Sequence, residues 1–170
     1  MSQGIHRAPP PDPSAYGNCF GCAPGNMKGM RLQFRHDEAG RILTDVQLGV
    51  DYESFPGIIH GGIVATVLDE VMARASLHVH RMPSMTVGLR LRYVQAMRTG
   101  QRYVATAEVQ SRDGELVRLQ GRLETESNGL VAAADATFIL LDAERMDTAR
   151  HGLPAETLES FKRYMQRVTQ

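Results

Sequence analysis

The 170-residue sequence is short of cysteine, of net charge and of long apolar runs. Two cysteines are too few for a disulfide-rich scaffold. No apolar run approaches the roughly 18 residues of a membrane span, and the first residues lack the apolar core of a secretory signal. We therefore expect a soluble cytoplasmic protein with a single globular core, because one domain usually takes about 150 residues.

An excess of charge of one sign is also missing. Nineteen basic side chains balance nineteen acidic ones, so the net charge at pH 7 is zero. Nucleic-acid binders usually carry a basic excess, and the balance argues against that class. Only Lys28 and Lys162 are lysines, which leaves 19 − 2 = 17 arginines. Arginine binds phosphate well, but a bias in genome composition would give the same count.

The hydrophobic pattern predicts several strands and one buried helix. Alternating apolar residues predict strands at about residues 30–35, 41–48, 86–93, 103–109, 117–123 and 130–141, and Asn128-Gly129 is typical of a hairpin turn. Apolar residues at helical spacing predict a largely buried helix from Gly61 to about His80, which Pro83 ends. A second helical pattern covers residues 154–168.

This order of elements predicts an α+β fold in which a curled antiparallel sheet wraps around one long central helix. We expect a flexible proline-rich arm over residues 1–16, the main domain over 17–145, and an amphipathic helix within 146–170 packed on that domain. One helix leaves part of the sheet uncovered, so we also expect self-association through a sheet face or edge.

The start of the buried helix is the best candidate for chemistry. Gly61 and Gly62 allow another molecule close to the backbone, where free N–H groups suit an anion. Asp69 stands two turns further along on a stripe of small side chains, and a buried carboxylate without a partner is costly. His60 is either a cap or a substrate contact, and Glu70 is expected to reach solvent or a surface arginine. A mid-helix aspartate can also be simply solvated.

The pair Cys19 and Cys22 leaves three interpretations open. A zinc site lacks a second Cys/His pair at suitable spacing, and a redox motif lacks a following helix. Structural or incidental cysteines are the favoured interpretation, and we expect no metal.

Residues 55–72, from Phe-Pro-Gly through His-Gly-Gly to Asp-Glu-Val-Met, resemble the central helix of hotdog-fold acyl-CoA thioesterases. The similarity is greatest to the phenylacetate-pathway type and to related thioesterase superfamily members. Residues 18–26 and 28–32 resemble the cysteine-containing segment that precedes the domain in one branch of that family. Residues 86–93 resemble the third strand of the family. The resemblance covers Asn18 to Leu141.

The resemblance implies catalytic roles for particular residues. Asp69 would be the nucleophile or the general base for water, and the Gly61 N–H would hold the thioester oxygen. Thr86 would orient water, facing Asp69 across a dimer interface. Ser54 stands where several relatives carry an asparagine, and a serine reaches less far. Arg90 and Arg92 share a strand face and are candidates for the CoA phosphates, although they equally suit a solvated face.

The function implied is hydrolysis of an acyl-CoA thioester without a cofactor, by a homodimer or dimer of dimers. Gly62 would bind the substrate, and His60 would belong to the catalytic residues. Two alternatives stay open: a hydratase or dehydratase of acyl thioesters, and a non-catalytic protein that binds acyl-CoA. Fold alone does not choose among them.

Overall fold

The computed structural model describes residues 17–168, so the arm expected over residues 1–16 lies outside the described residues. A 3₁₀ turn (Val50–Tyr52) precedes the second pair of strands. The other elements in chain order are β1 (Phe34–His36), β2 (Ile42–Val46), β3 (Glu53–Phe55), β4 (Ile58–Ile59), α1 (Gly61–His80), β5 (Ser84–Tyr93), β6 (Tyr103–Asp113), β7 (Leu116–Thr125), β8 (Leu130–Leu140), α2 (Ala143–Arg150) and α3 (Ala155–Val168).

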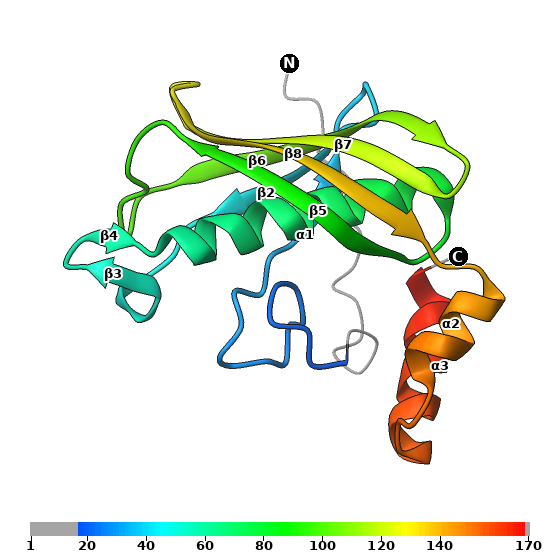
Figure 1. Cartoon of the computed structure of the whole chain (residues 1–170). Coiled ribbons are helices and arrows are strands. Elements are labelled where there is room, and N and C mark those ends of the chain that lie inside the picture. Colours follow the sequence, from blue (N-terminus) through cyan, green and yellow to red (C-terminus); the bar gives the residue numbers. More distant parts are fainter. Residues whose placement is uncertain (1–16, 169–170) are drawn as a thin grey trace.

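Six strands form one antiparallel sheet in the order β1-β2-β6-β7-β8-β5, while β3 and β4 form a separate pair. The sheet curls around α1, as Figure 1 shows. This arrangement confirms the predicted α+β fold. The buried side of α1 carries apolar residues three and four positions apart, which puts them on one helix face: Val64, Val67, Leu68, Val71, Met72 and Ala75.

Small residues on the inner face of the sheet let α1 lie close to it. Ala132, Ala134 and Ala136 of β8 are buried there. A Cβ atom on Gly121 of β7 would lie 3.2 Å from Met72 of α1, closer than side chains normally approach. A side chain at this position would therefore require the Met72 and Leu68 side chains to shift by a few tenths of an ångström.

Both ends of α1 agree with the prediction. The helix begins at Gly61 after the capping residue His60 and ends at His80. Arg81 then adopts a left-handed conformation (φ 53°), and its N–H bonds to the carbonyl of Leu77. Pro83 follows two residues later, where it cannot continue the helix. Among residues 17–168, no helix is both long and apolar enough to cross a membrane.

The first strand is shorter than predicted. Met30 and Leu32 are buried, as their alternation indicates, but β1 begins only at Phe34. The N–H groups of Met30 and Leu32 bond instead to the carbonyls of Phe20 and Gly21. Residues 30–32 therefore pair with the cysteine loop rather than with the sheet.

The C-terminal region contains one helix that the sequence analysis did not predict. The Asp142 side chain caps α2 by accepting from the Arg145 N–H at 2.9 Å. The predicted domain boundary at residue 145 thus falls inside α2. The later helix, α3, covers the predicted region, and the Arg150 guanidinium lies over the Phe161 ring. Both helices extend away from the sheet (Figure 1).

Candidate active site

In the first turn of α1, the N–H groups of Gly62 and Ile63 are hydrogen-bonded, whereas the Gly61 N–H has no acceptor among the described residues. The His60 Nδ1 atom accepts from the Gly62 N–H at 2.9 Å, so His60 is a cap and a neutral ring carries its proton on Nε2. The Gly61 N–H lies at the positive end of the helix, where backbone N–H groups attract negative charge.

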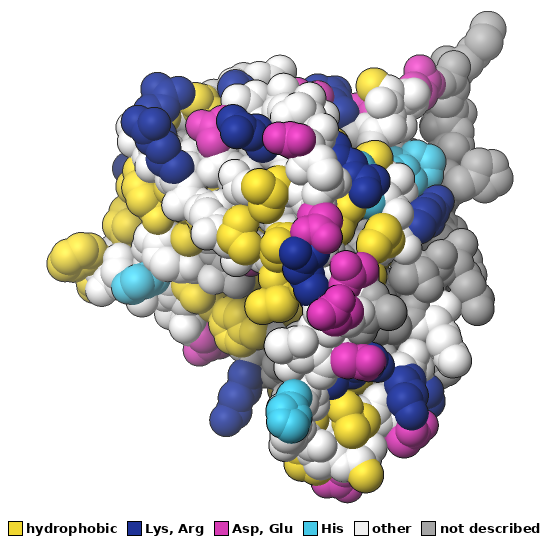
Figure 2. All heavy atoms as spheres, turned by 45° about the vertical axis from the view of Figure 1, so that its right-hand side comes forward, with side chains coloured by type: hydrophobic (Ala, Val, Ile, Leu, Met, Phe, Trp, Pro, Cys, Tyr) yellow, Lys and Arg dark blue, Asp and Glu magenta, His cyan; other side chains and the backbone are white. Residues whose placement is uncertain are grey.

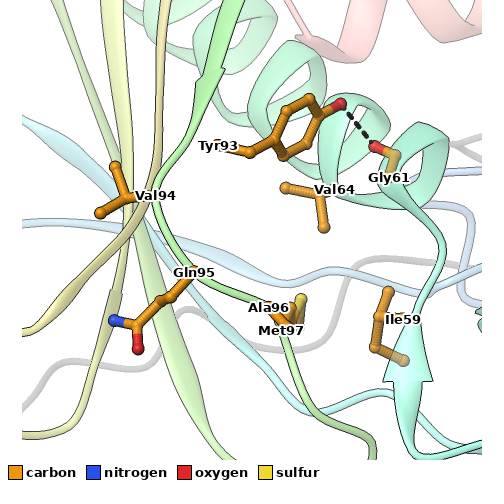
Figure 3. Close-up of a pocket in the computed structure, with 8 residues that line it drawn as sticks. All are labelled: Ile59, Gly61, Val64, Tyr93, Val94, Gln95, Ala96 and Met97. Atoms are coloured by element: carbon orange, nitrogen blue, oxygen red, sulfur yellow. Dashed lines mark hydrogen bonds between the residues drawn. The ribbon is translucent and has the colours of Figure 1, made fainter.

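A mostly apolar pocket of about 300 Å³ opens beside this helix start (Figure 3). The Tyr93 hydroxyl donates to the Gly61 carbonyl oxygen at 2.9 Å and so forms one wall. The alternating pattern of residues 86–93 predicted only a strand at Tyr93 and gave no sign of this role. The lining residues are Ile59, Gly61, Val64, Tyr93, Val94, Gln95, Ala96 and Met97.

Asp69 is held by a hydroxyl from the neighbouring edge strand. The Thr86 Oγ1 atom donates to Oδ1 of Asp69 at 2.7 Å. Both residues belong to the same chain, so the expected contact across a subunit interface is wrong. Asp69 is half-buried, and the hydrogen bond fixes one of its two oxygens.

A β-bulge explains why Thr86 faces Asp69. Thr86 pairs with Phe138 and Gly88 pairs with Thr137, so Val87 is an extra residue in β5. Leu89 and Leu91, opposite the buried Ala136 and Ala134, face the helix. Simple alternation would put Thr86 on the other face, and the extra residue turns it toward α1.

The two halves of the expected site are far apart within one chain. Gly61 and Asp69 are eight residues apart on a continuous helix, which corresponds to about 12 Å along its axis. The N–H groups of the first turn also point away from the helix body, so an oxygen bound there lies further still from Asp69. A single carbonyl group therefore does not reach both groups of one chain.

Three residues that were predicted to bind substrate make no contact with Asp69. Arg90 and Arg92 pair with Asp135 and Ala133, on the sheet face opposite α1, and both are exposed. Ser54 is exposed in β3, within the segment that leads to His60. The substrate-binding roles of these residues remain predictions.

Glu70 lies elsewhere than expected. It packs against the cysteine loop rather than reaching solvent or a surface arginine, and the Cys19 thiol donates to its Oε1 at 3.4 Å. Burial raises the pKa of the Glu70 carboxyl to about 7. The hydrogen bond from Cys22 lowers the pKa of the Cys19 thiol to about 5, and the same contact raises the pKa of Cys22.

The outer edge of β5 is open. β5 is the last strand of the sheet, so its far edge has no neighbouring strand among the described residues. Figure 2 shows hydrophobic side chains exposed among interspersed acidic and basic ones on this side of the molecule. At least a third of each of the following side chains on and after β5 is exposed: Met85, Val87, Leu89, Tyr93 and Val94.

Comparison with known proteins finds similarity over the segment that carries this site. Residues 56–132 match the family model of the thioesterase superfamily. Human acyl-coenzyme A thioesterase 13 is 24% identical over 95 residues, which cover 55% of this chain and 68% of that protein.

Two solved structures share the fold. Thioesterase superfamily protein RHA08564 has a TM-score of 0.66 and 24% identity over 69% of this chain, although the match spans only 58% of that chain. Protein BH2602 from Bacillus halodurans, solved with CoA, has a TM-score of 0.59 and 24% identity, covering 67% of this chain and 76% of the other. The family match covers the helix that carries Gly61 and Asp69, and the solved structures share the hotdog fold of this chain.

Proposed function

We propose that this protein hydrolyses acyl-CoA thioesters, with Asp69 as the catalytic carboxylate and the Gly61 N–H as the oxyanion donor. The observation that carries the proposal is the 2.7 Å bond from Thr86 to Asp69. A hydroxyl that holds one carboxylate oxygen leaves the other free to act on water or on a carbonyl carbon. The likeness to an acyl-CoA thioesterase supports the substrate class.

The reacting groups come from two copies of the chain. Because about 12 Å separates Gly61 from Asp69 along α1, one thioester cannot contact both groups in one subunit. Two copies that join through the open β5 edge bring two α1 helices side by side. Asp69 and Thr86 of one copy then face the helix start of the other, and a symmetric dimer has two such sites.

The proposed reaction uses Asp69, the Gly61 N–H and water. Water adds its oxygen to the thioester carbonyl carbon while Asp69 takes a proton, and the carbonyl oxygen gains charge against the Gly61 N–H. The carbon–sulfur bond then breaks, and the CoA sulfur takes the proton. If Asp69 attacks directly, an anhydride forms and water opens it. A single turnover in ¹⁸O-water leaves label in Asp69 only on the anhydride route.

The pocket beside Gly61 suits the acyl part of the substrate. Its walls include Ile59, Val64 and Met97, and apolar walls favour an alkyl or aryl group over a charged one. Arg90 and Arg92 lie on the outer sheet face, where they meet the CoA phosphates if the nucleotide crosses the β5 edge.

Release of free CoA tests the proposal. A thiol-reactive dye measures the CoA released from short, medium, long and aromatic acyl-CoAs. The assay compares the wild type, Asp69→Asn and the exposed control Asp113→Asn. The signal from Cys19 and Cys22 is subtracted. We expect a fall of roughly 10²-fold or more in kcat for Asp69→Asn alone. Equal rates in all three proteins would refute the role of Asp69. Binding of acyl-CoA without turnover would instead support the non-catalytic alternative.

A further inference from the structure

The strongest feature outside the proposed active site is the contact between the loop at Cys19 and Cys22 and the helix residue Glu70. One ligand-type atom from each of the three side chains lies within 4.8 Å of the other two. Each side chain is partly buried, and Glu70 is 51 positions from Cys19 in sequence. We propose that Cys19, Cys22 and Glu70 form a zinc site that fastens residues 19–22 to α1.

The spacing of these atoms matches a tetrahedral zinc site. With zinc bonds of about 2.3 Å to sulfur and about 2.0 Å to oxygen, a ligand sulfur and a ligand oxygen stand about 3.5 Å apart. The Cys19 Sγ and Glu70 Oε1 atoms are 3.4 Å apart. The Cys22 Sγ atom lies within 4.8 Å of both, so small side-chain movements bring all three atoms to bonding distance of the ion.

The loop is already shaped to present the first sulfur. The backbone N–H groups of Gly21 and Cys22 help to lower the pKa of the Cys19 thiol. The Ala23 N–H bonds to the Cys19 carbonyl at 3.1 Å, and the Met30 N–H bonds to the Phe20 carbonyl at 2.8 Å. Hydrogen bonds of this kind orient metal ligands and hold them before the ion arrives.

The chemistry of the donors selects the metal. Two sulfur ligands favour zinc over magnesium or calcium, which prefer oxygen. On binding, each thiol gives its proton to solvent and its sulfur donates an electron pair to Zn²⁺, with no change in oxidation state. The three protein ligands carry three negative charges, the ion carries two positive charges, and Arg74 lies close enough to act on Cys22. Water completes the fourth position.

Gly21 makes the contact with Glu70 possible. A Cβ atom at this position would overlap the Glu70 carboxyl group, which is the mobile end of its side chain. Gly21→Ala therefore displaces Glu70 from the cysteines without removing any ligand. Gly25 in the same loop has no atom within 4 Å of the place of its Cβ, so Gly25→Ala is a matched control.

Metal content and cobalt spectroscopy test the site in the full chain. The protein is purified under reducing conditions, its zinc is measured by mass spectrometry, and the zinc is then replaced by Co²⁺. We expect one zinc per chain, and a sulfur-to-cobalt charge-transfer band with the intense visible bands of tetrahedral cobalt. The chain has two cysteines, so a thiolate band can come only from Cys19 and Cys22.

Variants and chelator competition identify the ligands. We expect Cys19→Ser and Cys22→Ser to remove the band, and Glu70→Gln and Gly21→Ala to weaken zinc binding roughly tenfold or more, while Gly25→Ala binds as the wild type does. If a cysteine variant does not fold, alkylation of the wild type still tests the site. We expect bound zinc to protect both thiols from alkylation until a chelator is added. No zinc and no cobalt band in the reduced wild type, or equal affinity in Gly21→Ala and Gly25→Ala, would overturn the proposal. A Cys19–Cys22 disulfide that persists in the presence of zinc would identify a redox pair instead.

Discussion

The hydroxyl of Thr86 donates to the carboxylate of Asp69 at 2.7 Å, from an edge strand to the central helix of the same chain. The bond depends on an extra residue, Val87, which turns Thr86 toward the helix. β-bulges commonly re-aim a side chain beside an active site. The geometry therefore links a local irregularity of β5 to the orientation of the proposed catalytic carboxylate.

Replacing Thr86 tests whether this bond matters for turnover. We expect Thr86→Val to lower kcat roughly tenfold or more with little change in KM, because the carboxylate loses its orientation but the substrate pocket is untouched. Thr86→Ser keeps the hydroxyl and should retain most of the activity. CoA release measured over a range of substrate concentrations gives both constants. A Thr86→Val enzyme as fast as the wild type would show that Asp69 does not need this partner.

Gly61 offers a substitution that removes one N–H group and leaves the helix intact. Proline is favoured at the first helical position, and the preceding residue, His60, has an extended conformation (φ −61°, ψ 135°) that proline accepts. We expect Gly61→Pro to lower kcat by about 10²- to 10³-fold, the usual cost of one oxyanion donor. Gly61→Ala keeps the N–H, and its Cβ would lie 3.5 Å from the Tyr93 hydroxyl, an ordinary contact. A Gly61→Pro protein with wild-type circular dichroism and unchanged kcat would exclude the donor role.

Co-expression of the two inactive variants extends this prediction to the subunit arrangement. A mixed dimer of Gly61→Pro and Asp69→Asn chains has one complete site if each site uses Gly61 from one chain and Asp69 from the other. With random pairing, half of the dimers are mixed and half of their sites work, so about a quarter of the wild-type activity returns. Activity no higher than that of either variant alone would mean that each site lies within one chain.

The sequence predicted the parts of the fold that hydrophobic periodicity determines. Apolar residues such as Val67, Leu68 and Val71 recur at helical spacing, and the bounds of α1 were accordingly correct. The predicted start of β1 was wrong because an alternating pattern indicates which residues are buried, but not which hydrogen-bond partners they have. Met30 and Leu32 are buried, but their N–H groups bond to the cysteine loop.

The site was harder to predict because it depends on contacts between distant residues. The resemblance pointed to Asp69 and Thr86, but their meeting within one chain depends on a bulge that the alternating pattern hides. Glu70 is adjacent to Asp69, and nothing in the helix itself indicates that it packs against Cys19. The glycines of the loop gave no signal either, since a Cβ atom on Gly21 would overlap Glu70 whereas one on Gly25 would meet no atom within 4 Å.

The open edge of β5 gives a prediction about assembly. We expect Val87→Lys to weaken dimerisation roughly a hundredfold, because a charge on an edge strand opposes strand pairing. Activity should fall with the dimer fraction if the site is shared between subunits. Leu116→Lys is the control, since Leu116 is an exposed apolar residue at the start of β7, away from this edge. Sedimentation equilibrium of the three proteins checks the prediction, and an intact Val87→Lys dimer would place the interface elsewhere.

The environment of His78, near the C-terminal end of α1, predicts that the folded protein is less stable in mild acid. Burial lowers the pKa of His78 below its ordinary value of about 6.5, and the nearby charges of Arg81, His36 and Arg74 act in the same direction. The unfolded chain therefore takes up a proton at a higher pH than the folded chain does. The stability contributed by neutral His78 is complete above pH 6.5 and declines as the pH falls toward the pKa of the folded state.

Urea denaturation at pH 7.5 and pH 5.5 measures this effect. The difference between the two midpoints should be smaller in His78→Gln than in the wild type, because glutamine does not titrate. His151→Gln, at an exposed position after α2, should behave as the wild type. The ring of His36 stacks on His78 with centroids 5.5 Å apart, so protonation also places positive charge against this neighbour. An unchanged difference in His78→Gln would mean that other groups account for the acid sensitivity.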